Sequence, residues 1–130
     1  MAESYLPPLG VVRAAQIARR RRESVPPAQR GLTAIGLRRI TQLAGRERVS
    51  RDTLRRLLGY LSRHLKDKRA STWAKRGRGY VAWHAWGGDP GGRWALRTLR
   101  RDDRQWYDTW ARSPRNRALI RHLRGQEGRS

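Results

Sequence analysis

Positive charge is the feature that most constrains how this chain can fold. Its 130 residues include 31 Lys or Arg and only 10 Asp or Glu, which gives a formal net charge of +21 and a pI near 11.9. Charges of one sign repel one another and oppose a compact state, so a partner that neutralises them is expected. A basic domain with a pI above about 9 has the usual electrostatic signature of a nucleic-acid-binding protein. The composition therefore predicts a polyanionic partner, with DNA as the first candidate.

Several classes of function are disfavoured by what the chain lacks. It has no cysteine, which removes disulfides, cysteine-ligated zinc and thiol catalysis and suits a reducing compartment. No apolar run approaches the ~20 residues that span a bilayer, and no signal-peptide pattern opens the chain. His64, His84 and His122 fall on separate predicted elements, without the spacing of metal ligands. We expect no cofactor, no metal, no membrane and no enzymatic activity, and a location in the cytoplasm.

Hydrophobic spacing predicts an all-α fold, a small domain of five to six helices with extended basic termini. Apolar residues recur at helical intervals, and no segment alternates with a period of two for more than a few residues. We expect irregular segments at residues 1–10 and 66–79, and helices at residues 11–23, 34–44, 51–65, 80–86, 90–110 and 114–124. The stretch at residues 100–104 permits a bend within the helix at residues 90–110. The chain then divides into a basic N-terminal arm and helix (1–25), a helical core domain (26–95) and basic C-terminal helices with a tail (96–130).

The third expected helix carries the clearest core face. Five leucines share one stripe of it, at positions i, i+3, i+4, i+7 and i+11: Leu54, Leu57, Leu58, Leu61 and Leu65. We predict that this stripe organises the core and that Trp83, Trp86 and Trp94 pack against it, because large aromatic side chains bury much area each.

Small polar residues mark four expected helix starts. Thr33 and Ser50 each precede an apolar-periodic segment, as N-capping residues do. Asp89 precedes Pro90 and Ser113 precedes Pro114, and proline is favoured at the first helical position. In the helix after Thr33, Ile35 is expected to face inward.

Residues 83–94 (WHAWGGDPGGRW) admit two interpretations. The glycines would let a backbone approach phosphate while the tryptophans stack on bases. Alternatively, Gly87 and Gly88 end one helix, Asp89 and Pro90 start the next, and the tryptophans fill the core beneath the turn. The second interpretation is favoured, because a surface rarely exposes three tryptophans within twelve residues.

Residues 37–65 resemble a helix-turn-helix, in which early side chains of the second helix meet base edges. Those side chains would be Arg51, Asp52 and Arg55, with Arg56 and Arg63 directed at phosphate. The turn over residues 45–49 is longer than the usual three or four residues. An ordinary helical hairpin with a basic exposed face therefore remains an alternative.

A second basic cluster is the run at the end of the first expected helix. Four consecutive arginines share it: Arg19, Arg20, Arg21 and Arg22. Together with Arg51, Arg55, Arg56 and Arg63, they are the residues predicted to contact nucleic acid, on a surface that the intervening segments bring together.

The sequence also resembles a family of small phage and prophage proteins of uncharacterised biochemical role. The resemblance covers roughly residues 26–95. Three patterns carry it: an entry "RGxT…G", a helix "VSxxTxRR…YxxRHxxDK" that matches from Val49 to Lys68, and a closing "AWxxWGGDxGxxWA" that matches from Ala82 to Ala95. The chain departs from the family in its long basic ends, residues 1–25 and 96–130. The resemblance implies a phage context and little about mechanism.

Two hypotheses of function follow. The first is a phage-encoded DNA-binding protein whose Arg-rich helices grip phosphates. The second is a virion structural protein, such as a head, connector or cement component, that docks basic helices onto acidic faces of a capsid-type partner. A location in the virion and membership of an oligomer or assembly belong to the second. An RNA-binding or ribosome-associated protein is a third possibility.

We predict that DNA binding is strongly salt-dependent, because the chain is rich in arginine. We also predict that it is largely independent of base sequence, because Asn is a typical base-reading residue and the chain has only one. If six to ten phosphates are engaged, affinity falls on the order of 10³–10⁵-fold between ~50 and ~200 mM salt. Fluorescence anisotropy across a salt series measures this. A flat salt response, or no binding at ~50 mM salt, contradicts the prediction.

Overall fold

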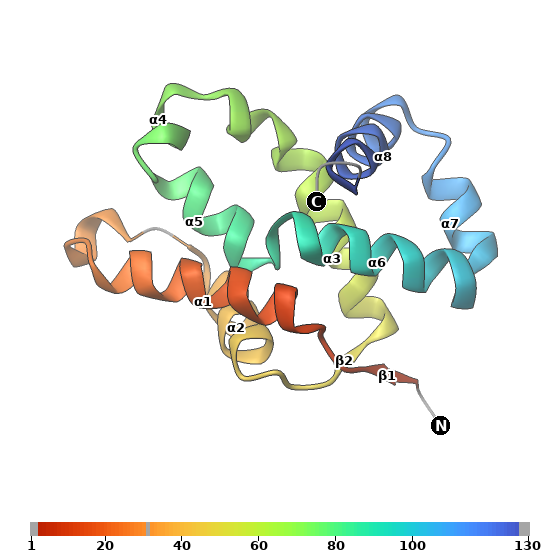
Figure 1. Ribbon diagram of the computed structural model, residues 1–130, viewed down its shortest axis with the longest axis horizontal. Helices are drawn as coiled ribbons and strands as arrows, with labels where there is room; N and C mark the ends of the chain where they lie inside the picture. The colour runs from red at the N-terminus through yellow and green to blue at the C-terminus, as the bar shows by residue number, and fades with distance from the viewer. Residues whose placement is uncertain (1–2, 31, 128–130) are drawn as a thin grey trace.

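The computed structural model of the chain describes residues 3–30 and 32–127, and its structure is 77% helical, which confirms the all-α fold class (Figure 1). In chain order the elements are β1 (Ser4–Tyr5), α1 (Leu9–Glu23), the 3₁₀ helix η1 (Pro27–Gln29), α2 (Ala34–Ala44), β2 (Val49–Ser50), α3 (Arg51–His64), the 3₁₀ helix η2 (Leu65–Arg69), α4 (Ser71–Ala74), α5 (Arg78–Ala85), α6 (Gly88–Asp102), α7 (Arg104–Trp110) and α8 (Pro114–Glu127).

Helix α6 lies at the centre of the molecule. It contacts α1 on one side and α3 and α8 on the other, and Figure 1 shows α1 below it and α8 above it. Helix α1 also packs against α2 and α5. The buried residues Val11 and Ala15 of α1, and Leu119 and Leu123 of α8, belong to the same hydrophobic cluster. Both basic ends of the chain therefore contribute helices to one core.

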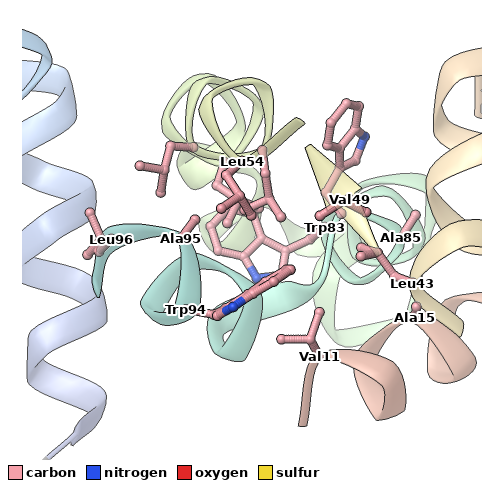
Figure 2. Close-up of a cluster of buried hydrophobic side chains, with 14 of the residues drawn as sticks. Val11, Ala15, Leu43, Val49, Leu54, Trp83, Ala85, Trp94, Ala95 and Leu96 are labelled. Carbon is pink, nitrogen blue, oxygen red and sulfur yellow. The ribbon is translucent and has the colours of Figure 1, made fainter. Parts of the chain in front are cut away.

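The predicted leucine stripe and tryptophans form the centre of that core. Leu54, Leu57, Leu58 and Leu61 are fully buried, whereas Leu65 is only partly buried at the start of η2. The exposed fractions of Trp83, Trp86 and Trp94 are 7% or less. Figure 2 shows the indoles of Trp83 and Trp94 between Leu54 of α3 and Val11 of α1. The interpretation of residues 83–94 as a helix junction above a tryptophan core is confirmed.

Two of the four predicted N-caps are confirmed by hydrogen bonds, and α8 begins at Pro114, directly after the predicted cap Ser113. The Thr33 hydroxyl accepts a hydrogen bond from the Gly36 amide at 3.2 Å, and the Ser50 hydroxyl accepts one from the Thr53 amide at 3.1 Å. The third is wrong. Helix α6 begins at Gly88, before Asp89, because Gly87 adopts a φ of +99° and reverses the chain one residue earlier. The carboxylate of Asp89 is then directed to other partners.

The predicted inward orientation of Ile35 is also wrong, since half of its surface is exposed. Helix α2 buries the face formed by Gly36, Ile40 and Leu43. Ile35 lies one position from Gly36, which rotates it about 100° around the helix axis from that face.

Three segments are more regular, or differently divided, than expected. Residues 1–10 were predicted to be irregular, but Ser4 and Tyr5 pair antiparallel with Ser50 and Val49, and α1 already begins at Leu9. The predicted connector 66–79 contains η2 and α4. The helix predicted at residues 90–110 is two helices, because Asp103, within the stretch 100–104 that permits a bend, leaves helical geometry at φ −142° and ψ 50°.

Helices α6, α3 and α8 meet at Gly92. A Cβ atom at this position would lie 2.8 and 2.9 Å from the two Cδ atoms of Leu123 and 3.1 Å from Cδ1 of Leu61. Both leucines are fully buried, so neither has free space into which it can turn. The close approach of α8 to α6 therefore requires glycine at residue 92.

We predict that Leu58→Ala lowers the free energy of unfolding by roughly 2–5 kcal/mol, because it leaves a cavity in a fully buried site. Urea unfolding followed by tryptophan fluorescence measures the change. Arg97→Ala, on the exposed face of α6, is the matched control and changes stability by less than about 0.5 kcal/mol. A Leu58→Ala variant that unfolds like the parent contradicts this packing.

Candidate nucleic-acid interface

The arginine run at the end of α1 is partly engaged within the protein. Arg19 and Arg20 are exposed. Arg21 donates from Nε to the carbonyl of Arg76 at 3.1 Å and from Nη2 to the carbonyl of Lys75 at 3.2 Å. Arg22 is half-buried, and its Nε has no hydrogen-bond partner among the residues the structure describes. Part of this run therefore holds the segment between α4 and α5 against α1.

The arginines predicted on α3 are also mostly paired with carboxylates. Arg51 pairs with Glu3, Arg55 donates from Nε to Oδ2 of Asp103 at 2.8 Å, and Arg56 pairs with Asp52 at 2.9 Å. Arg63 is exposed and forms no ion pair with a described carboxylate. Arg51 and Arg55, the predicted readers of base edges, are thus engaged within the chain.

The two predicted groups lie apart from each other. Arg20 and Arg21 line a surface pocket together with Arg76, whereas Arg55, Arg56 and Arg63 line a cleft on α3. In Figure 1 the end of α1 lies at the left edge of the molecule, and α3 begins beside β2 at the lower right. The structure does not bring the eight predicted arginines onto one surface.

A different basic surface lies between α8 and the end of α3 with η2. Two adjoining pockets form it, with volumes of about 450 and 260 Å³, and both are lined by Leu65, Arg69 and Ala118. We call this surface the basic groove. Its titratable lining residues are all cationic or histidine: Arg63, Lys66, Lys68, Arg69, Arg115, Arg121 and His122.

The groove has two cationic walls. Arg115 and Arg121 stand on α8, and Arg63, Lys66 and Arg69 stand on α3 and η2. All five side chains belong to exposed residues, and none forms an ion pair with a described carboxylate. Their full charges are therefore directed into the solvent of the groove.

Asp89 contacts two of the residues that line this groove, Lys68 and His122. Its carboxylate accepts hydrogen bonds from Lys68 Nζ at 3.0 Å and from Trp83 Nε1 at 3.0 Å, and it lies 3.2 Å from Nε2 of His122. Burial raises the pKa of Asp89, but the hydrogen bond and charge of Lys68, joined by His122, outweigh burial and hold that pKa below its ordinary value. One carboxylate thus ties η2, α5 and α8 to the start of α6.

Helix α8 is also locked onto α3 by a buried polar contact. Ser62 donates its hydroxyl hydrogen bond to Oδ1 of Asn116, and Nδ2 of Asn116 donates to the carbonyl of Trp110 at 2.8 Å. Asn116 is 7% exposed. The only Asn of the chain therefore has a structural partner on α3 and positions the α8 wall of the groove.

Six of the seven groove residues were missed by the sequence analysis, which proposed only Arg63. They come from two segments that lie side by side only after α8 docks on α3. One signal was available: Asn116, Leu119, Ile120 and Leu123 follow helical spacing, which leaves Arg115 and Arg121 outside that stripe. The partner wall could not be inferred, because residues 66–79 lack a hydrophobic period.

The histidines have carboxylate neighbours that their sequence spacing did not predict. His64 Nδ1 lies 3.1 Å from Asp67, and His122 lies beside Asp89. Across residues 3–30 and 32–127, no group of three or more His, Asp or Glu is placed to hold a metal ion. No helix in the described part of the chain is both long and apolar enough to cross a bilayer.

No protein-family model, no curated protein and no solved structure matches this chain. Its function is therefore inferred from the geometry and charge of its own surface.

We predict that Asp89→Asn lowers the free energy of unfolding at pH 7 by roughly 1–3 kcal/mol. This loss is smaller than the about 3–5 kcal/mol that follows when one partner of a fully buried ion pair is removed, because the Asp89 side chain is 18% exposed. The depressed pKa stabilises the folded state above the ordinary carboxyl pKa of about 3.9, and this stabilisation is lost as pH falls through the folded-state pKa. Urea unfolding at pH 7 and pH 3 should show a smaller acid-induced loss in the variant. An equal loss in both proteins contradicts the role of Asp89.

Proposed function

We propose that this protein is a non-enzymatic nucleic-acid-binding protein that holds a phosphate backbone in the basic groove. The observation that carries the proposal is the set of five exposed cations on two facing walls, without carboxylate partners among the described residues. Carboxylates already neutralise part of the charge: six Lys or Arg side chains of the described residues form ion pairs, and of these six only Lys68 lines the groove.

The dimensions of the groove suit a short run of phosphates. Arg115 and Arg121 are six residues apart on α8, a separation of ~9 Å along the helix axis. One strand of a duplex advances about 3.4 Å per phosphate along its axis, so this wall spans about two to three phosphates. Arginine presents a planar fork of donors that suits bidentate phosphate contacts.

Binding of this kind depends on charge and shape rather than on base sequence. Phosphate contacts fix register and orientation and carry no direct sequence information. The Asn of the chain, a side chain suited to reading adenine, is buried against α3. We therefore assign the groove to general affinity for nucleic acid.

The groove prediction compares two variants of equal charge. The groove variant replaces Arg69, Arg115 and Arg121 together with alanine. The control variant replaces Arg13, Arg38 and Arg97 with alanine, and these three residues are exposed and lie outside the groove. The groove variant should lose most of the affinity for DNA. Its plot of log affinity against log salt should also be shallower, because about three phosphate contacts are lost and each contributes ~0.9 to the slope. The control variant should lose only the part of the affinity that depends on net charge.

Anisotropy with a fluorescent DNA measures both effects, and circular dichroism confirms that both variants fold. Equal losses in the two variants would locate affinity in the overall charge and reject the groove. The virion hypothesis makes a different forecast, because these arginines then face carboxylates of another protein. Poly-glutamate that binds with the same dependence on the groove, while DNA does not bind, would favour it.

A further inference from the structure

A second cleft adjoins the basic groove and differs from it in chemistry. It has a volume of about 570 Å³ and lies over α3, between the start of α2 and α7. We call it the aromatic cleft and define it by six lining residues: Ile35, Arg55, Arg56, Tyr60, Arg63 and Trp106. Arg63 lines this cleft and the basic groove alike, so its side chain borders both.

We propose that the aromatic cleft receives unpaired bases of a single-stranded nucleic acid whose phosphates lie in the basic groove. This inference rests on the proposed function and deepens it by naming the substrate class. A base has flat apolar faces and an attached anionic backbone, and single-strand-binding proteins meet these with aromatic side chains beside basic grooves.

The cleft combines apolar and cationic surface with one carboxylate, that of Asp52, which pairs with Arg56. Ile35 is 50% exposed on its rim, and Trp106 is partly exposed on the opposite side. Arg55 lies over the Trp106 ring, with Cζ 5.5 Å from the ring centroid, while Asp103 holds its Nε. The guanidinium plane is thus fixed before a ligand arrives, so less side-chain entropy is lost when a base stacks on it.

The floor of the cleft is rigid and still offers a polar group. The ring of Tyr60 stacks on Trp86 with centroids 4.7 Å apart and on His64 with centroids 4.2 Å apart. Its hydroxyl forms no hydrogen bond with the described residues and is protonated at neutral pH, as tyrosine ordinarily is, and burial raises the pKa of Tyr60 further, to about 12. It can therefore donate a hydrogen bond to the edge of a base.

The placement of α3 argues against recognition of a duplex. A recognition helix must project to enter a major groove. Here Thr33 and Ile35 of the α2 start flank the exposed face of α3 on one side, and Trp106 of α7 flanks it on the other. A paired base stays within its stack, whereas an unpaired base can enter a recess of this kind.

The test compares single-stranded DNA with a duplex of the same sequence and length, using anisotropy at ~50 mM salt. A matched pair of variants separates the cleft from general charge: Ile35→Asp lies in the cleft, and Leu37→Asp lies on the same helix outside it. Both residues are exposed, so both variants should fold. We expect the parent to prefer the single strand, and Ile35→Asp to weaken that binding on the order of tenfold more than Leu37→Asp.

Trp106→Ala gives a second measurement, and Trp106→Tyr should restore binding by retaining a stacking surface. Single-stranded RNA of the same sequence, tested in parallel, identifies which nucleic acid is preferred. Equal binding of single strand and duplex, with equal effects of the two aspartate variants, overturns this inference and leaves the groove proposal intact. Absence of binding to any nucleic acid rejects the proposed function itself. Cleft-dependent binding of poly-glutamate alone assigns the cleft to a protein partner and overturns the inference.

Discussion

The carboxylate of Asp89 is the contact on which the arrangement of the surface depends. It accepts hydrogen bonds from Trp83 at the centre of the core and from Lys68 of η2, and it lies beside His122 of α8. These partners lie 6, 21 and 33 residues away along the chain. Because η2 and α8 carry cations of both walls of the basic groove, this one anion holds the two walls against the start of α6.

Apolar packing stabilises the core of the molecule, and charge dominates its surface. The core is built from leucines, small alanines and three tryptophans, which bury much apolar area per residue. The few carboxylates compensate positive charge where segments must meet: Glu3 beside Arg51, and Asp103 beside Arg55 at the break between α6 and α7. Most of the remaining arginines face outward, where their mutual repulsion favours a polyanion, whereas Arg39 is 5% exposed and Arg22 is half-buried.

Local rules predicted the helices well and the surface poorly. The leucine stripe from Leu54 to Leu61 and the caps at Thr33 and Ser50 depend on neighbours within a few residues, so the sequence contains the information that specifies them. Asp89 was misassigned as a cap because a left-handed glycine, set by contacts with α1 and α6, starts the helix earlier. The groove was missed because its walls are far apart in sequence and only docking of α8 joins them.

The stack through Tyr60 joins two motifs of the sequence, one from Val49 to Lys68 and one from Ala82 to Ala95. Tyr60 and His64 come from the motif that ends at Lys68, and Trp86 comes from the motif that ends at Ala95. Arg39 continues the stack on Trp86, with Cζ 5.1 Å from the ring centroid. A change at any layer alters the surface offered to the next. The four residues of this stack run from Arg39 of α2 through Trp86 and Tyr60 to His64 at the end of α3. Substitutions at these four positions are therefore expected to covary among relatives.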